Sequence, residues 1–265
     1  MMRHRPQLLP GTPGPGTPSF ADHFSHVAGA YAARRPGYPA ELFAWLAGLV
    51  TRRALAWDCA TGSGQAAVGL AAHFARVIAT DASAAQLAAA AAHPRVAYRA
   101  APAERSGLET GTVDLVTVAQ AIHWFDLPAF YAEVRRVLTP AGVIAAWTYR
   151  GAGLDDAALT GAVERFMLET VGPYWPSVRG LVNSGYQTLP FPFDEIAAPP
   201  FTMTAEWTLD ELLGYVATWS AVSRYREAQG RDPMSLIEAE LLTAWGPRER
   251  RRQVRWPVLM RVGRV

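Results

Sequence analysis

Short apolar runs alternate with amphipathic stretches along the first 150 residues of the chain. Five runs have the length and composition of buried strands, at residues 55–60, 76–80, 96–101, 113–119 and 143–149. The stretches between them have the periodicity and the turn signals of helices of about ten residues. Short apolar strands that alternate with helices are typical of a parallel sheet covered on both faces. We therefore expect a doubly wound α/β fold.

Capping residues and prolines mark where the intervening helices begin and end. The pattern predicts helices over 20–33, 39–50, 65–74, 83–92 and 126–139. Ser83 and Asp126 can each accept a hydrogen bond from the first helical turn as an N-cap. The prolines of the 35–39 segment separate the first two helices, because proline disfavours helical backbone at the residue before it.

The region after Arg150 has a different character, because it is acidic and rich in aromatic residues. Here the pattern predicts helices at 163–171, 209–223 and 233–245, and strands at 201–207 and 253–262. An aromatic-rich insertion can form a satellite core under long loops. It can also form a lid over a ligand pocket. We expect both interpretations to hold, for different residues.

These changes in composition predict the organisation of the chain. Residues 1–19, rich in proline and glycine, are expected to be a disordered leader. Residues 20–265 are expected to form one domain. Its cofactor-binding core would span 20–150, its lid and substrate region 151–246 with one sheet strand near 201–207, and its closing strand 247–265.

Composition excludes several classes of protein. All 25 basic residues are arginine, which removes every mechanism that needs a lysine. The single cysteine, Cys59, excludes a disulfide framework and a cysteine-based metal site. No apolar run approaches the roughly 18 residues of a membrane span, and the first 20 residues lack a signal-peptide pattern. We therefore expect a cytoplasmic protein with no membrane partner and no bound metal.

The net charge of +2 is unevenly distributed, with an acidic region between two basic ones. A basic C-terminal segment can indicate nucleic acid or a membrane surface. Here, however, Arg255, Arg261 and Arg264 are interleaved with apolar residues. This alternation favours the solvent side of a strand.

A glycine-containing loop between the first strand and its helix carries the first candidate chemistry. Asp58 ends the strand, and Gly62 and Gly64 follow it. Glycine permits positive φ and a close approach of the backbone to a ligand. Asp81 ends the next strand, where a carboxylate can accept hydrogen bonds from the two hydroxyls of a ribose. Together the loop and the acid predict an adenosine-binding half-site.

Two classes of adenosine cofactor fit this half-site. The segment from Gly62 to Ala67 also matches the G-x-G-x-x-A pattern of dinucleotide-binding proteins, so NAD(P) is one alternative. Against it, Asp58 is placed to face a cationic amino group rather than a pyrophosphate. A polar and aromatic segment, 120–125, also follows the fourth strand, where a substrate would lie.

The order of these segments resembles the class I S-adenosylmethionine-dependent methyltransferases. The similarity rests on Asp58, the Gly62–Gly64 loop, Asp81, Ala103-Glu104, and the run from Ala119 to Phe125. It covers roughly residues 20–265. The subgroup it most resembles acts on small molecules and includes the trans-aconitate methyltransferase-like proteins. Segments 31–39, 218–222 and 255–259 are similar to the leader and tail of that subgroup.

The resemblance implies a fold, a cofactor and a set of binding residues. The fold would be a Rossmann-like, mostly parallel seven-stranded sheet with an antiparallel C-terminal strand and an aromatic-rich helical lid insertion. The cofactor would be S-adenosylmethionine. The residues expected to bind it are Asp58, Ala60, Gly62 and Gly64 in the loop, Asp81 and Ala82 at the ribose, Ala103 and Glu104 at the adenine, and Gln120 at the methionine end.

The chain departs from the family pattern at two positions. Ala60 stands where the first loop glycine is usual, which implies a φ below zero or a slightly wider turn. Pro102 stands where an acid often meets the adenine amino group, so Glu104 is expected to substitute.

The acceptor side of the site is predicted from residues with open alternatives. Tyr31 and Arg35 would clamp a carboxylate, or Arg35 would be a surface residue at a helix end. His123 would be a general base, or only a hydrogen-bond donor, or a packed ring beside Trp124. His123 and Trp124 would face the acceptor. Trp219 would be a pocket wall or part of the satellite core.

The predicted activity is methyl transfer to a small organic acceptor. A carboxylate or hydroxyl oxygen is preferred as the acceptor atom, and nitrogen is the alternative. The segment 120–123 lacks the Asn/Asp-Pro-Pro-aromatic motif that goes with methylation of a nucleobase amino group, and the acidic insertion would repel a phosphate backbone. We therefore expect no nucleic-acid partner. The rival functions are an NAD(P)-dependent oxidoreductase and a non-enzymatic module that keeps the fold.

Overall fold

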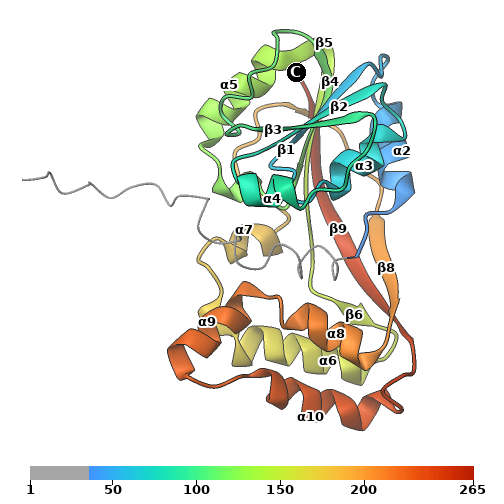
Figure 1. Cartoon of the computed structure of the whole chain (residues 1–265), viewed down its shortest axis with the longest axis vertical. Helices are drawn as coiled ribbons and strands as arrows, with labels where there is room; N and C mark the ends of the chain where they lie inside the picture. The colour runs from blue at the N-terminus through green and yellow to red at the C-terminus, as the bar shows by residue number, and fades with distance from the viewer. Residues whose placement is uncertain (1–35) are drawn as a thin grey trace, which may run out of the picture.

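The computed structural model describes residues 36–265. A sheet flanked by helices forms one part of the molecule, and a group of helices lies at the end of its longest strands (Figure 1). The predicted helix at 20–33, the leader, and the candidate residues Tyr31 and Arg35 lie outside the described residues.

The elements follow the alternation expected from the sequence over the first half of the chain. The strands are β1 (Leu55–Cys59), β2 (Arg76–Asp81), β3 (Val96–Ala100), β4 (Val113–Ala119), β5 (Leu138–Tyr149), β6 (Gly153–Leu154), β7 (Asp194–Glu195), β8 (Phe201–Trp207) and β9 (Arg252–Arg264). The α-helices are α2 (Ala40–Gly48), α3 (Gln65–Ala71), α4 (Ala84–Ala88), α5 (Leu127–Val137), α6 (Ala157–Arg165), α7 (Arg179–Asn183), α8 (Leu209–Val216), α9 (Ser220–Gln229) and α10 (Met234–Trp245). A 3₁₀ turn, η2, covers Ile122–Trp124, and a π-helical turn, η3, covers Phe166–Thr170.

Within the described residues the strands form one nine-stranded sheet in the order β3-β2-β1-β4-β5-β9-β6, with β7 and β8 also paired to β9. Strands β1 to β5 are parallel to one another, and β9 is antiparallel to β5. This confirms the Rossmann-like fold and its antiparallel C-terminal strand. The sheet exceeds the predicted seven strands because β6 and β7, of two residues each, carry no periodic signal.

Two apolar clusters cover the two faces of the sheet. Residues of α2 and α3 pack against alternate residues of the strands, among them Ala56 and Leu115, and that cluster continues into the helices after β5. The intervening strand residues, including Trp57 and Val116, pack with α5 and α7 on the other face. Burial on both faces explains why these strands read as continuous apolar runs.

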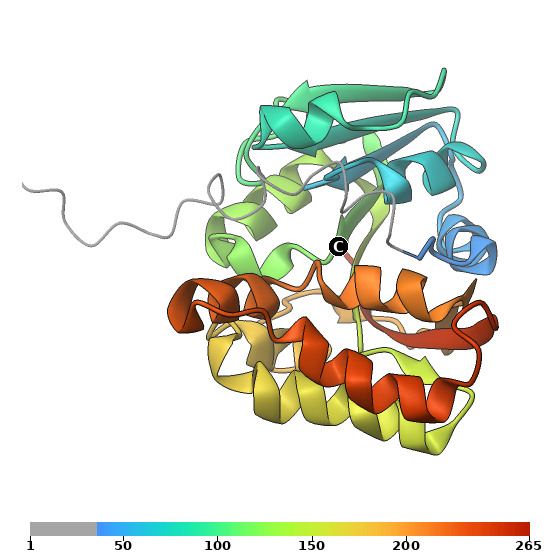
Figure 2. The same cartoon turned by 60° about the horizontal axis from the view of Figure 1, so that its bottom comes forward.

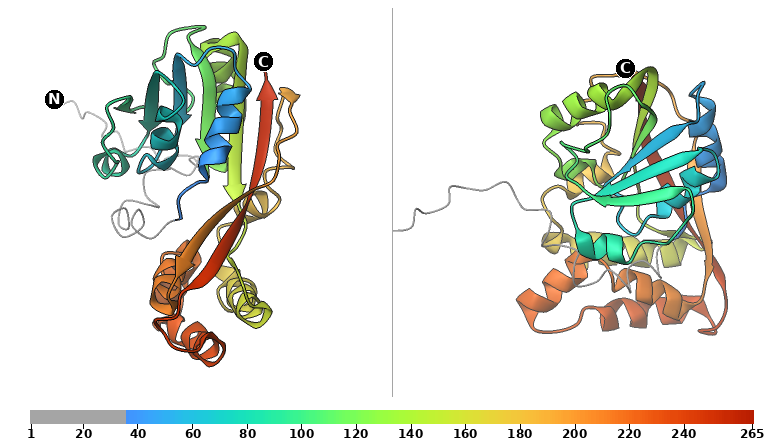
Figure 3. Two further views of the ribbon diagram at one scale, coloured as in Figure 1. Left: turned by 90° about the vertical axis from the view of Figure 1, so that its right-hand side faces the viewer. Right: turned by 45° about the horizontal axis from the view of Figure 1, so that its top comes forward.

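Helices α6, α8, α9 and α10 lie beyond the carboxyl ends of the parallel strands. Strand β5 runs from the sheet toward this group, and β8 and β9 connect the group to the sheet (Figure 3, left). The group comes forward in Figure 2. These helices are formed by the aromatic-rich region after Arg150, so the insertion predicted as a lid lies at the open edge of the sheet. Among residues 36–265 no helix is both long and apolar enough to cross a membrane.

Several predicted helix bounds were wrong. Helix α4 ends at Ala88 rather than Ala92, because Ala91 instead hydrogen-bonds the Ser63 carbonyl and the Tyr98 hydroxyl. Helix α6 begins at Ala157, six residues before the predicted start, because the Asp156 carboxylate caps two amides of its first turn. The predicted helix 209–223 is two helices, α8 and α9, separated by residues 217–219.

The assignment of the C-terminal arginines to the solvent side is wrong for Arg261. Its side chain is 8% exposed and forms an ion pair with Glu195. Its guanidinium also donates to the carbonyls of Tyr186 at 3.2 Å and Leu189 at 2.6 Å. The segment from Tyr186 to Glu195 packs on this face of β9. The alternation of polar and apolar residues within β9 does not indicate that another segment covers this face. Arg255, by contrast, is exposed.

Candidate functional site

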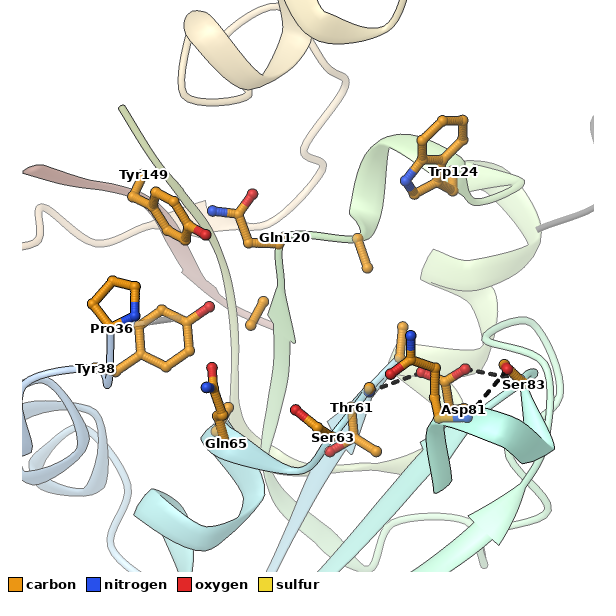
Figure 4. A pocket seen from close by; sticks show the side chains of 16 residues that line it. Pro36, Tyr38, Thr61, Ser63, Gln65, Asp81, Ser83, Gln120, Trp124 and Tyr149 are labelled. Carbon is orange, nitrogen blue, oxygen red and sulfur yellow. Dashed lines mark hydrogen bonds between the residues drawn. The ribbon is translucent and has the colours of Figure 1, made fainter. Parts of the chain in front are cut away.

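A pocket opens at the carboxyl ends of β1, β2 and β4, where doubly wound sheets bind their ligands. Its wall combines the β1–α3 loop, the ends of β2 and β4, and aromatic side chains from other parts of the fold (Figure 4). The lining residues are Pro36, Tyr38, Ala60, Thr61, Gly62, Ser63, Gln65, Ala66, Asp81, Ser83, Gln86, Ala119, Gln120, Ala121, Trp124 and Tyr149.

The β1–α3 loop forms one wall through left-handed backbone at three positions. Gly62 and Gly64 have φ values of 55° and 84°, and Ala60 has a φ of 53°. The expectation of a negative φ at Ala60 is therefore wrong, because the alanine adopts the conformation that glycine would take. A Cβ added to Gly64 would lie 2.2 Å from the Tyr98 hydroxyl, so this position requires glycine. Backbone strain of this kind is typical of binding sites.

Asp58 lies beneath this loop and not among the residues that line the pocket. Its carboxylate is fully buried and accepts hydrogen bonds from the hydroxyls of Thr61, at 2.5 Å, and Thr117, at 2.7 Å. Burial raises the pKa of Asp58 from 3.8 to about 6, against the opposing effect of these hydrogen bonds. The carboxylate therefore ties the loop to β4 through Thr61 and Thr117.

Asp81 reaches the pocket from the end of β2. One carboxylate oxygen accepts the Gly62 amide and the other accepts the Ser83 amide, each at 2.8 Å (Figure 4). Burial raises its pKa from 3.8. Because each carboxylate oxygen has a second lone pair, Asp81 can also accept hydrogen bonds from a ligand. Its neighbour Ala82 is exposed and is not a lining residue.

Gln120 follows β4 and has the unusual φ of 61°. Its Oε1 accepts a hydrogen bond from the Thr148 hydroxyl at 3.1 Å. Its Nε2 is buried and has no hydrogen-bond partner among the described residues. A buried amide N–H without a partner is costly, and Gln120 lines the pocket. The side chain is therefore suited to donate to an anionic group of a ligand.

His123 and Trp124 lie on η2, just after Gln120, but only Trp124 lines the pocket. The His123 ring stacks on Tyr186, and its Nδ1 is 3.0 Å from the Tyr186 hydroxyl oxygen. Burial, followed by the positive charge of Arg179, lowers the pKa of His123 from 6.5 to about 4. The imidazole is therefore neutral at pH 7, and it is a weaker base than a free imidazole.

Ala103, Glu104 and Trp219 are also not among the residues that line the pocket. Ala103 is buried in the second apolar cluster. The Glu104 carboxylate accepts the amide of Asp126, at 3.1 Å. Trp219 is 6% exposed and packs against Phe166, Trp175 and Tyr215. The roles predicted for these residues stay predictions.

The structure also brings residues to the pocket that sequence reasoning had not selected. Among them are Tyr38, Gln65, Gln86 and Tyr149, and Tyr186 adjoins His123. Tyr38 lies in the 31–39 segment that resembles the family leader, so a signal for it was present. Tyr149 ends an apolar strand and carried no such signal, whereas Tyr186 stands in the aromatic-rich region that was predicted to form a lid or a satellite core.

Comparisons with known proteins agree on one family. Residues 57–146 match the model of a methyltransferase domain. The chain is 33% identical over 239 residues to a methyltransferase of Dictyostelium discoideum, covering 88% of this chain and 90% of that protein. It is 33% identical over 199 residues to an uncharacterized methyltransferase of Mycobacterium tuberculosis, covering 74% and 76%.

Solved structures show the same similarity in three dimensions. The structure of a type II methyltransferase from Anaeromyxobacter dehalogenans superposes with a TM-score of 0.83 at 47% identity. It covers 87% of this chain and 97% of that one. The similarity therefore extends beyond the sheet to the helices and strands that follow β5.

Proposed function

The chain belongs to the class I S-adenosylmethionine-dependent methyltransferases, and we propose that its pocket binds this cofactor and that the protein methylates a small organic acceptor. The observation that carries the proposal is the pocket at the carboxyl ends of β1, β2 and β4. It combines a left-handed glycine loop, a buried carboxylate and an unpartnered amide N–H.

These residues fit the chemical groups of the cofactor. Asp81, a buried acceptor at the pocket wall, would hold the ribose hydroxyls. Gln120, through Nε2, would donate to the methionine carboxylate. The backbone of Ala60 and Gly62 would meet the methionine moiety. Asp58 would act indirectly, by holding Thr61 and the loop in place. The backbone of Ala103 and the side chain of Glu104 would meet the adenine.

The cofactor, when bound, supplies a methyl group on a positively charged sulfur, and the protein supplies orientation and proton transfer. His123, a neutral and weakly basic imidazole, would orient a hydroxyl acceptor through a hydrogen bond and would take its proton only as the methyl group is transferred. A carboxylate acceptor needs no base. The positive charge of Arg179 lowers the pKa of both His123 and Tyr186, so this side of the site is electrostatically positive. We therefore propose oxygen as the acceptor atom, with nitrogen as the alternative.

We propose a small organic acid as the acceptor. Similarity of segments 31–39, 218–222 and 255–259 to the trans-aconitate methyltransferase-like subgroup supports a small acid. Ala60, which stands where the family usually has a loop glycine, gives some support to the rival function of a non-enzymatic module. That support is weakened, because Ala60 has the left-handed backbone that the loop requires.

Two measurements test the proposal. A thermal shift assay should show stabilisation by S-adenosylmethionine and by its demethylated product, but not by NAD, because a ligand that binds only the folded state stabilises it. Incubation with methyl-labelled S-adenosylmethionine and a panel of small acids, phenols and amines should then label an acid or a phenol. Stabilisation by NAD alone would refute the assignment of the cofactor. Labelling of amines alone would refute the choice of oxygen.

A further inference from the structure

Helix α4 turns a polar residue, Gln86, toward the pocket. Gln86 is the one buried residue of this helix, with 8% of its surface exposed, although glutamine is mostly found on protein surfaces. It lines the pocket, and within residues 36–265 its side-chain amide has no hydrogen-bond partner. Because buried polar groups are normally hydrogen-bonded, an amide that opens only toward a pocket indicates a contact with a ligand.

The N-cap of α4 fixes Gln86 relative to Asp81. The backbone amide of Ser83 donates to Asp81 Oδ1 at 2.8 Å (Figure 4), and the backbone amide of Gln86 donates to the Ser83 hydroxyl at 3.3 Å. Both side chains also adjoin Gly62. The Gly62 amide donates to Asp81 Oδ2 at 2.8 Å, and Gln86 Oε1 lies 3.8 Å from the point that a Cβ on Gly62 would occupy. The amide and the carboxylate therefore belong to the same part of the pocket wall.

The two side chains offer different hydrogen-bonding groups to a ligand. An ionised carboxylate only accepts, and each Asp81 oxygen already accepts one backbone amide, so each keeps a further lone pair. The two neighbouring hydroxyls of a ribose can donate one proton each to these oxygens. Each hydroxyl oxygen then still has lone pairs, to which Asp81 cannot donate. Gln86 carries two N–H groups on Nε2, so it supplies the donor that the carboxylate lacks.

We infer that Gln86 is a cofactor-binding residue, which donates from Nε2 to the oxygen of a ribose hydroxyl whose proton Asp81 accepts. The inference rests on the proposed function, because it takes the ribose of S-adenosylmethionine as the ligand group at Asp81. The carboxylate and the amide bind this hydroxyl together, one as acceptor and the other as donor. Removal of the hydroxyl from the cofactor abolishes both contacts at once, so its effect on affinity depends on the presence of the Gln86 amide.

The test compares binding of the demethylated cofactor with binding of its 2′-deoxy and 3′-deoxy analogues, by calorimetry, in the wild type and in Gln86→Met. Methionine keeps the length of the side chain but removes the amide. Gln86→Met should weaken binding of the demethylated cofactor about 3- to 10-fold, as expected for the loss of a neutral hydrogen bond. For one of the two analogues, the loss of affinity relative to the demethylated cofactor should be smaller than in the wild type by a similar factor. The Tm without ligand should not fall, because the amide has no partner within the described residues.

Gln65→Met is the matched control, because Gln65 also lines the pocket but lies on the far side of Thr61 and Ser63 from Asp81 (Figure 4). This variant should show the same loss of affinity for each deoxy analogue as the wild type. Wild-type losses for both analogues in Gln86→Met would overturn the inference, and so would an equal reduction of the loss in Gln65→Met. Failure of the wild type to bind the demethylated cofactor would instead refute the proposed function, and the inference with it.

Discussion

Asp58 gives the sharpest test of how burial acts in this site. Its carboxylate is fully buried beneath the loop and bonded only to hydroxyl and amide groups. The change to test is Asp58→Asn, which keeps the shape and one acceptor oxygen but removes the charge. Because the amide cannot ionise, the folded variant does not bear the free-energy cost of a buried negative charge.

The magnitude follows from the pKa, which is raised from 3.8 to about 6. The folded protein binds this proton more tightly than the unfolded chain does, so the contribution of Asp58 to stability falls as pH rises between these two values. At 1.36 kcal/mol for each pH unit, ionisation costs the folded state about 3 kcal/mol above pH 6. About 2 kcal/mol of that cost arises between pH 4.5 and pH 8.

The assay is urea unfolding of both proteins at about pH 4.5 and about pH 8. The stability of Asp58→Asn relative to the wild type should be about 2 kcal/mol more favourable at the higher pH. Asp156→Asn, at the exposed cap of α6, reports how a surface change of the same kind behaves over this range. An equal difference in unfolding free energy at both pH values would show that the Asp58 carboxylate is not desolvated, and would refute the reasoning.

Other changes test the loop, the ribose contact and the aromatic cluster. Asp81→Ala should weaken binding of S-adenosylmethionine by about 1.5–3 kcal/mol, the range for hydrogen bonds to a charged group; calorimetry showing an unchanged dissociation constant would place the ribose elsewhere. Ala60→Gly should raise the unfolding free energy by about 0.5–1 kcal/mol. Left-handed backbone costs alanine about 1–2 kcal/mol, and the greater conformational entropy of glycine in the unfolded chain reduces this gain. Ala66→Gly, in the first turn of α3, is the matched control and should lower the unfolding free energy. Trp219→Ala should cost about 3–5 kcal/mol of stability as a core truncation, and the acceptor KM of the refolded variant tests its predicted role as a pocket wall.

Local chemistry explains the parts of the fold that the sequence predicted correctly. The apolar runs became β1 to β5 because strands buried on both faces leave little room for polar residues. Ser83 and Asp126 cap their helices as expected, because capping depends only on residues within the first turn. The glycines and Asp81 meet at one pocket because the carboxyl ends of parallel strands share an edge.

Contacts between distant segments decided the rest. Arg261 alternates with apolar residues as a solvent-facing residue would, yet a segment more than sixty residues away covers it and supplies Glu195. Ala60 takes a left-handed backbone because the loop around it is held through Asp58, Thr61 and Thr117, which lie on different elements. Periodicity records which side of a strand a residue occupies, and not what packs against that side.

The sequence alone thus determined the sheet, its helices and the cofactor edge, because these depend on local propensity and on the pattern of burial. The tertiary structure alone decided which polar groups face the pocket and which are buried beside it. Tyr186 shows this best: its aromatic-rich region predicted a lid or a satellite core, but only the packing of its own segment against η2 brings its hydroxyl to His123. A hydrogen bond depends on the positions of atoms far apart in the chain, and those positions exist only once the chain has folded.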